Sequence, residues 1–274
     1  MLKQALFPII KKLKKELFPA LKKIEDAAIK TLPVKKNFNI EKLNIGKINK
    51  LMEKLELFFS NTNQWDDVFK KEGITVYPEI LPDVADLGNK LKNNALVFDI
   101  GCGSGRHVCY LSKQNFQLFG IDYSKTAINE CKKWLQKEKL KARLTHGDMY
   151  KKLPYPKNFF DAVISIKALH HGTIKEIKNL VKEIERVLKP NSYFLLETPA
   201  KQERREGIIL LDKNTISPLS GREKGLPHYI FTKRSIKKIF KNFNIVYLKT
   251  KESPTSKRPH FIMLSKINEN GNKK

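Results

Sequence analysis

Apolar residues follow two different periods along most of the chain, and their alternation predicts strands separated by helices. Short apolar runs of the length expected for buried strands begin at Ala95, Phe116, Ala142, Asp161 and Ser192. Between these runs the apolar residues recur every three or four positions, as on one face of a helix; residues 125–140 are an example. Strands that alternate with helices form a mostly parallel sheet, so the pattern predicts an α/β domain.

The last part of the chain breaks this alternation. A helix is predicted over residues 232–242, and strands are predicted over residues 243–250 and 260–266. No helical pattern separates the two strands. Strands joined without a crossover helix pair as antiparallel neighbours, so an antiparallel hairpin is expected at the C-terminal end of the sheet.

The stretch from Ala95 to Gly105 carries the clearest chemical signal. Its apolar run ends at Asp99 and leads into glycines at 101, 103 and 105, before a helix predicted over residues 106–114. Glycine admits positive φ and lets a ligand lie against the main chain. The start of a helix presents unpaired N–H groups and a positive dipole end. The turn is therefore expected to bind a ligand that carries negative or hydrogen-bond-accepting groups.

Polar residues stand at the ends of the strands that follow. Asp122 ends the second strand, Asp148 follows the third, and His170 with His171 follows the fourth. Ligands of doubly wound sheets bind at the carboxyl ends of the strands, where an acid can accept hydrogen bonds from a ribose. The pattern thus favours a nucleoside-containing ligand.

Together these residues resemble the class I S-adenosylmethionine-dependent methyltransferases, over about residues 65–267, and within them the methyltransferase type 11 and tellurite-resistance-like group. The resemblance implies a Rossmann-like, seven-stranded, mostly parallel sheet with a C-terminal antiparallel hairpin, and S-adenosyl-L-methionine as cofactor. The chain departs from the dinucleotide-binding fingerprint, because Arg106 stands where that fingerprint has its last glycine. The cofactor-binding residues that the resemblance and the pattern indicate are Asp99, Gly101, Cys102, Gly103, Gly105, Asp122, Tyr123, Asp148, Met149 and Ser165.

Within this resemblance, Asp122 matches the acid on the ribose hydroxyls, and Asp148 with Met149 matches the pair beside the adenine. A Trp-Asp segment precedes the cofactor domain in such relatives and helps to cover its pocket. Trp65 and Phe69 lie one helical turn apart, as in such a cover. The alternative is that both rings only anchor their helix to the core.

Methyl transfer requires few chemically active side chains. It requires in-line positioning and exclusion of water, and a general base only where the acceptor must lose a proton. His170 and His171 are the candidate bases; one packed and one solvated histidine is the structural alternative. The candidate substrate-binding residues are Arg106, His228 and Tyr229. The last two belong to a long polar connection, residues 200–230, where simple loop packing is the alternative.

The sequence leaves the chemical class of the methyl acceptor open. Ser165 to Ala168 stand where methyltransferases of exocyclic or amide nitrogens carry Asn/Asp-Pro-Pro-aromatic, which disfavours such acceptors. Residues 161–173 resemble tRNA wobble-uridine O-methyltransferases, whereas residues 147–150 and 225–229 resemble small-molecule methyltransferases of the tellurite-resistance type. We favour a small-molecule acceptor. The alternatives are a tRNA-modifying methyltransferase and, from another class, a non-catalytic nucleotide- or RNA-binding protein.

Residues 1–60 form a separate basic extension. Apolar residues recur there at helical spacing with lysines between them, and Pro8 and Pro19 divide the pattern into short helices. Residues 1–30 could lie on an anionic membrane surface, bind RNA, or pack on the domain. The formal net charge of +26 also suggests RNA, although lysines spread along the whole chain give the same total.

These patterns divide the chain into the basic helical extension, a catalytic domain over residues 61–267 with a substrate-side insertion at 200–230, and a disordered tail at 268–274. Three cysteines argue against a disulfide framework, and no cysteine or histidine spacing indicates a metal site. Lysines interrupt every apolar run that a secretory signal would need, and no stretch approaches the ~18 apolar residues of a spanning helix. The sequence therefore predicts a cytoplasmic protein, or one peripheral at a membrane.

Overall fold

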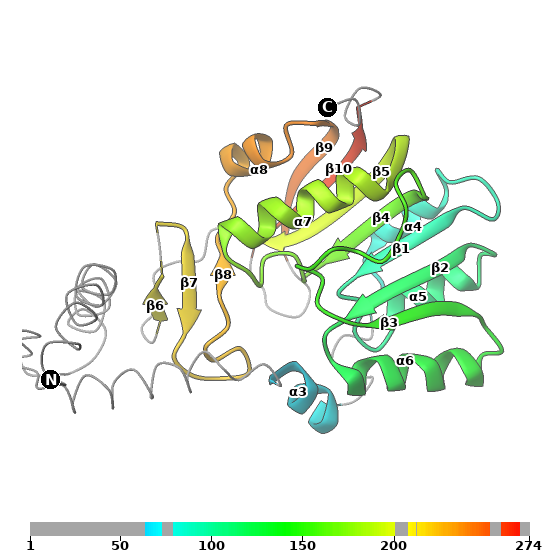
Figure 1. The fold of residues 1–274 in the computed structure, drawn as a ribbon, viewed down its shortest axis with the longest axis horizontal. Helices are drawn as coiled ribbons and strands as arrows, with labels where there is room; N and C mark the ends of the chain where they lie inside the picture. Colours follow the sequence, from blue (N-terminus) through cyan, green and yellow to red (C-terminus); the bar gives the residue numbers. More distant parts are fainter. Residues whose placement is uncertain (1–63, 73–78, 201–207, 212, 253–258, 269–274) are drawn as a thin grey trace, which may run out of the picture. The chain divides into compact units, whose positions relative to one another are not determined.

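The computed structural model describes residues 64–72, 79–200, 208–211, 213–252 and 259–268 (Figure 1). The chain divides into two compact units. The larger unit comprises Asn63–Gln202 and Tyr229–Lys274, and the smaller comprises Met1–Thr62 and Glu203–His228. The expectations for residues 1–60 and for the tail beyond Asn268 lie outside the described residues.

The larger unit contains a seven-stranded sheet in the order β3-β2-β1-β4-β5-β10-β9. Its strands are β1 (Leu96–Ile100), β2 (Gln117–Asp122), β3 (Ala142–His146), β4 (Phe160–Ile166), β5 (Leu188–Pro199), β9 (Phe243–Glu252) and β10 (Pro259–Ile267). Strands β1 to β5 pair in parallel, whereas β10 pairs antiparallel with both β5 and β9. The predicted Rossmann-like α/β fold with its C-terminal antiparallel hairpin is confirmed.

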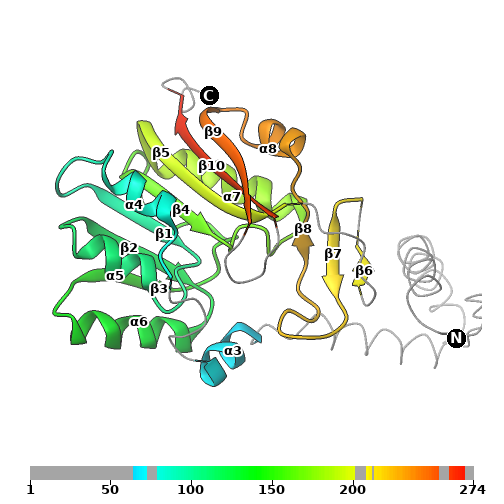
Figure 2. The ribbon, with the colours of Figure 1, turned by 180° about the vertical axis from the view of Figure 1, so that it is seen from behind.

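Helices cover both faces of this sheet, and α3 packs against α6. The described helices are α3 (Gln64–Glu72), α4 (Pro82–Gly88), α5 (Arg106–Ser112), α6 (Lys125–Lys137), α7 (Ile174–Val187) and α8 (Lys233–Ile239). Helix α7 lies across one face, and α4 and α5 lie on the opposite face (Figures 1 and 2). Side-chain caps set where two helices begin, as the sequence predicts: Ser124 accepts from Ala127 N–H, and Thr173 forms a reciprocal capping box with Glu176. Among the helices of the described ranges, none is long and apolar enough to cross a bilayer.

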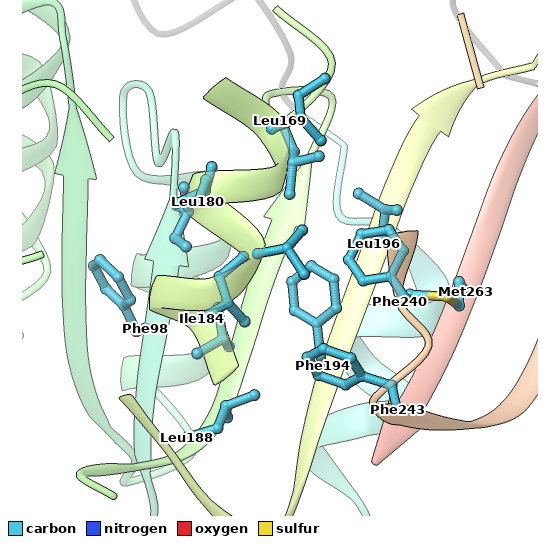
Figure 3. Close-up of a cluster of buried hydrophobic side chains, with 14 of the residues drawn as sticks. Phe98, Leu169, Leu180, Ile184, Leu188, Phe194, Leu196, Phe240, Phe243 and Met263 are labelled. Atoms are coloured by element: carbon cyan, nitrogen blue, oxygen red, sulfur yellow. The ribbon is translucent and has the colours of Figure 1, made fainter. Parts of the chain in front are cut away.

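Two apolar clusters fill the spaces between helices and sheet. The cluster on the α7 face is rich in aromatic rings (Figure 3). In it, the fully buried Phe194 of β5 lies 5.5 Å from Phe240 and 5.7 Å from Phe243, measured between ring centroids. The cluster on the other face joins α4, α5 and α6 to the sheet, through residues such as Val97 and Ile164. Because apolar side chains fill both faces, the polar side chains that could bind a ligand lie toward the ends of the strands.

The connection at residues 200–230 contains three short strands in its described part. Strands β6 (Ile208–Leu210) and β7 (Thr215–Pro218) pair antiparallel, and β8 (His228–Tyr229) completes a three-stranded sheet in the order β6-β7-β8. The sequence describes this segment only as a long polar connection. Its apolar runs are too short for hydrophobic periodicity to reveal strands.

The aromatic packing predicts that Phe194→Ala will lower the free energy of unfolding by about 3–5 kcal/mol, because it leaves a cavity beside two other rings. Val246→Ala is the control, since Val246 on β9 is 54% exposed and its truncation should change stability by no more than about 0.5 kcal/mol. Urea denaturation of the two variants tests this. Similar losses in both would contradict the described packing.

Candidate functional site

The turn after β1 is closed by hydrogen bonds to the end of β2. Gly101 N–H and Cys102 N–H both donate to the Ile121 carbonyl, over 2.8 and 3.1 Å. Gly101, Gly103 and Gly105 all have positive φ. A Cβ on Gly105 would also collide with the Cys131 sulfur on α6. The sequence therefore needs glycine here, and the turn exposes main chain rather than side chains to a ligand.

The carboxylate of Asp122 holds this turn in place. Its Oδ2 accepts from Gly103 N–H over 2.8 Å, and its Oδ1 accepts from Ser124 N–H over 2.8 Å. Burial raises the pKa of Asp122, and these N–H groups act in the opposite direction. Each carboxylate oxygen can accept a further bond. Asp122 therefore has capacity to accept from ligand hydroxyls, and the ribose contact expected from the sequence stays a prediction, as does that of the 44% exposed Tyr123.

Asp99 is a buried acid with an unused acceptor. Its side chain on β1 is 1% exposed, and Oδ2 has no hydrogen-bond partner among the described residues. Burial raises its pKa to about 7, and the positive charge of Arg106 lowers it. Arg106 begins α5, and its Nη1 donates to the Glu79 carbonyl over 2.6 Å. A buried acceptor without a donor is suited to a ligand N–H or ammonium group.

The other predicted cofactor residues lie around these two acids. Ser165 on β4 is fully buried and donates to the Ile100 carbonyl over 3.3 Å, so it ties β4 to β1 beneath the turn. Cys102 is 6% exposed, and burial raises the pKa of its thiol well above the usual value. Asp148 Oδ1 accepts from Tyr150 N–H over 2.9 Å, and the half-buried Met149 packs against the α7-face cluster. Asp148 and Met149 follow β3, next to β2 in the sheet.

Helix α3 is fixed against α6 and the glycine turn. Asp66 Oδ1 accepts from Ser124 Oγ over 2.9 Å and from Thr126 N–H over 2.8 Å. The bond from Thr126 N–H is the main cause of a pKa of Asp66 held well below its usual range. A Cβ on Gly103 would lie 3.2 Å from the Phe69 ring. The helix expected to cover the pocket therefore lies directly beside the turn.

His170 and His171 follow β4 with their rings together. The ring centroids are 3.9 Å apart, and His171 meets Trp65 of α3 edge-on at 5.2 Å. His170 is 5% exposed, His171 is half-buried, and the His170 carbonyl accepts from Tyr229 N–H over 2.8 Å. The pair stands at the carboxyl end of the sheet, within contact of the covering helix.

The predicted substrate residues His228 and Tyr229 belong to different compact units. Tyr229 is 6% exposed and lies in the α7-face cluster, with its ring edge-on to Phe231 at 4.8 Å. His228 ends the smaller unit, with Nδ1 3.0 Å from the Leu226 carbonyl and Nε2 3.2 Å from Glu223 Oε2. Tyr229 therefore packs in the core and His228 lies beside a carboxylate, and their part in substrate binding stays a prediction.

A second polar group, which the sequence pattern does not indicate, lies at the same edge of the sheet. His260 Nδ1 on β10 lies 2.9 Å from Glu197 Oε1 on β5, and Lys167 N–H donates to the Glu197 carbonyl over 2.9 Å. Burial lowers the pKa of Lys167, and Glu197 acts in the opposite direction. A charged residue inside an otherwise apolar run, such as Glu197, is the signal that would have found this group.

Comparison with known proteins supports the fold and its ligand. Residues 98–196 match the methyltransferase domain family. A tRNA (carboxymethyluridine(34)-5-O)-methyltransferase of Arabidopsis thaliana is 34% identical over 142 residues, 52% of this chain and 32% of that protein. A sterol 24-C-methyltransferase of Pneumocystis carinii is 30% identical over 107 residues, 38% of this chain and 28% of that protein. The chain spans about a third of the length of these relatives.

Solved structures share the fold. A Methanosarcina mazei S-adenosylmethionine-dependent methyltransferase aligns with a TM-score of 0.57 and 21% identity, over 69% of this chain and 99% of the other. A Burkholderia thailandensis 1,6-didemethyltoxoflavin-N1-methyltransferase, bound to 1,6-didemethyltoxoflavin and S-adenosylhomocysteine, aligns with a TM-score of 0.58 and 17% identity, over 86% and 94%. At such identities the likeness shows the fold.

The buried Asp99 predicts a pH-dependent effect of Asp99→Asn on stability. The folded pKa is about 7, whereas an unfolded Asp titrates near ~3.9. A raised folded pKa contributes stability that is complete below the unfolded pKa and is lost as pH rises through the folded pKa. Urea denaturation should therefore show Asp99→Asn gaining stability relative to wild type between about pH 5 and about pH 8. A difference that is the same at both pH values would contradict the raised pKa.

The geometry of Asp122 predicts that Asp122→Asn will weaken S-adenosylmethionine binding by ~1.5–3 kcal/mol, or about 10- to 100-fold, because a charge-assisted acceptor is lost. Asp161→Asn is the matched control: Asp161 also accepts a backbone N–H, from Leu96, but lies at the amino end of β4. Titration calorimetry of both variants tests this. Equal affinity in wild type and Asp122→Asn would mean that the ribose binds elsewhere.

The residues at this edge fit S-adenosylmethionine. The glycine turn offers main chain at close approach, Asp122 offers acceptors for ribose hydroxyls, and the unfilled Oδ2 of Asp99 offers an acceptor for a ligand donor. The family match begins one residue before Asp99 and includes Asp122 and Asp148. Residues 98–196 are therefore similar to a methyltransferase domain, and they lie on a fold that solved S-adenosylmethionine-dependent methyltransferases share.

Proposed function

We propose that this chain catalyses methyl transfer from S-adenosylmethionine to an acceptor held at the carboxyl ends of β4 and β5. The observation that carries the proposal is the Asp122 carboxylate bonded to Gly103 N–H, beside the unfilled acceptor of Asp99, within the segment that matches the family. When bound, S-adenosylmethionine supplies an electrophilic methyl group. The chain then has to orient the acceptor and exclude water, and such positioning is worth roughly 7–11 kcal/mol.

The described residues divide these tasks. Gly103 and Asp122 bind and orient the nucleoside, and α3 excludes water where Phe69 adjoins the turn. Arg106 is positively charged beside the turn, so it suits an acidic group on either ligand. His170 and His171, at the exit of β4, are the proton acceptors expected from the sequence. A proton acceptor is needed only for acceptors that lose a proton on methylation.

We favour a small-molecule acceptor. In support, the Burkholderia thailandensis enzyme that aligns over 86% of this chain is bound to 1,6-didemethyltoxoflavin, a small molecule. A small acceptor also suits a site in which the covering helix α3 adjoins the glycine turn.

A tRNA acceptor is the second candidate, supported by two observations. One is the Arabidopsis thaliana relative that is named for a tRNA reaction. The other is a basic surface at α8, where exposed basic residues occur without an acid among them: Lys233, Arg234, Lys237, Lys238 and Lys241. Basic side chains gathered on one helix favour binding to phosphates. RNA or an anionic membrane surface as a partner of residues 1–30 stays a prediction, since those residues lie outside the described ranges.

Incubation with radiolabelled S-adenosylmethionine and a cell extract, followed by fractionation into RNA, protein, lipid and small molecules, tests the proposal. We expect label in the small-molecule fraction, and label in small RNA would instead establish the second candidate. Gly103→Val should abolish transfer, because the valine would press on Phe69 at a positive φ. Gly221→Val is the control for backbone strain, since Gly221 has positive φ but open space around it. Binding of S-adenosylmethionine without transfer to any fraction would contradict catalysis.

A further inference from the structure

A buried histidine–carboxylate pair lies at the carboxyl end of β5, apart from the residues that hold the nucleoside. His260 Nδ1 lies 2.9 Å from Glu197 Oε1, and the two side chains are 6% and 3% exposed. The two residues come from neighbouring antiparallel strands, β10 and β5, and are 63 positions apart in the chain. Pairing of strands, rather than a local turn, therefore brings them together.

Strand register places the pair at the ligand-binding edge. Asp99 pairs with Ile164 of β4, and Glu197 pairs with Ile166, two residues further along β4. Side chains two residues apart on a strand share a face, so Glu197 lies on the same face as Asp99 and closer to the carboxyl edge. Ligands of such sheets bind at this edge. In the strand order, Asp122 on β2 lies on one side of β4, and the His260–Glu197 pair on β10 and β5 lies on the other side.

Electrostatic interactions through Lys167 and Arg106 link Glu197 to Asp99, next to the glycine turn. Lys167 follows β4, its N–H donates to the Glu197 carbonyl, and its ammonium interacts with both Glu197 and Arg106. Glu79 also acts on Lys167, and Arg106 acts on Asp99. Glu197 is therefore part of the same electrostatic environment as the acid next to the turn.

The hydrogen bonding of Glu197 is incomplete among the described residues. Oε1 is bonded to His260, but the buried Oε2 has no partner there. An ion pair that serves only to stabilise a core normally has both carboxylate oxygens satisfied, because an unpaired one keeps its full desolvation cost. A spare buried acceptor at the ligand-binding edge is instead suited to a group that enters with the substrate.

We propose that His260 is the general base of the methyl transfer and that Glu197 is the residue that positions it. The inference rests on the proposed function. Glu197 accepts from Nδ1–H, which fixes the tautomer and leaves the lone pair on Nε2. The acceptor's lone pair forms the bond to the methyl carbon, the bond from that carbon to sulfur breaks with its electrons on sulfur, and the acceptor's proton passes to Nε2. The acceptor is therefore a protonated heteroatom, such as a hydroxyl or ring N–H, presented beside β5.

The tautomer can be measured without any methyl acceptor. In the ligand-free full chain with ¹⁵N-labelled histidine, NMR at a pH where the imidazole is neutral should show His260 protonated on Nδ1 and bare on Nε2. The resonance is assigned by its absence in His260→Gln. A ring protonated on Nε2 would overturn the proposal, because Nε2 would then have no lone pair with which to take the acceptor's proton.

The second measurement is the initial rate of label transfer to the extract fraction that wild type methylates. His260→Ala should lower this rate about 100-fold or more, leave the dissociation constant of S-adenosylmethionine unchanged, and regain part of the rate with added imidazole. Glu197→Gln should lower the maximal rate with cofactor affinity unchanged. Glu185→Gln is the matched control: Glu185 on α7 is a partly buried carboxylate that accepts from Asn242 over 3.1 Å, and its variant should keep the full rate.

The outcomes separate this inference from the proposed function. A normal rate in His260→Ala would overturn the inference and leave methyl transfer intact. Loss of rate in His170→Ala or His171→Ala but not in His260→Ala would move the base to the β4 exit. Failure of imidazole to restore any rate would make His260 structural. Wild type that binds S-adenosylmethionine but labels no fraction would contradict the proposed function, and the inference with it.

Discussion

The carboxylate of Asp122 is the interaction on which the site depends. One oxygen accepts from Gly103 N–H and fixes the glycine turn, and the other accepts from Ser124 N–H at the start of α6. Ser124 in turn donates to Asp66, which holds α3 beside the turn. A single half-buried acid thus connects the cofactor turn, the helix after β2 and the covering helix. These hydrogen bonds favour the ionised form and offset part of the desolvation cost, which still raises the pKa of Asp122.

The fold gathers its polar groups at one edge of the sheet. Both faces are filled by apolar side chains, including the fully buried Phe98 and Phe160, so buried charge would be expensive there. At the carboxyl edge, by contrast, Asp99 and Glu197 remain buried with unfilled oxygens. The rigid packing beneath them keeps these acceptors in place before a ligand arrives, and this preorganisation is what a methyl-transfer site requires.

Much of the fold follows from local sequence patterns. The third strand is predicted and observed at residues 142–146, and the Thr173 capping box forms as its spacing indicates. The helix predicted over residues 106–114 ends at Ser112, where polar residues follow the last buried turn. Periodicity identifies such elements because each buries one face. Their order along the chain is then enough to indicate a mostly parallel sheet.

The site is only partly predictable in this way. Asp99, Asp122 and the glycines are recognisable because they occupy one turn and the ends of two consecutive strands. The His260–Glu197 pair is not, since it forms only once β10 inserts next to β5. Tyr229 is a further example: the sequence predicts it at the substrate, and local pattern does not indicate that its ring also packs against the apolar core. Strand pairing and core packing are tertiary effects that local pattern does not contain.

A crystal structure of the full chain with S-adenosylhomocysteine would test the central claim most directly. We expect both ribose hydroxyls within hydrogen-bonding distance of Asp122, the adenine beside Asp148 and Met149, and the amino group of the homocysteine moiety near Asp99. A nucleoside bound away from the glycine turn, or a ribose that does not contact Asp122, would contradict it.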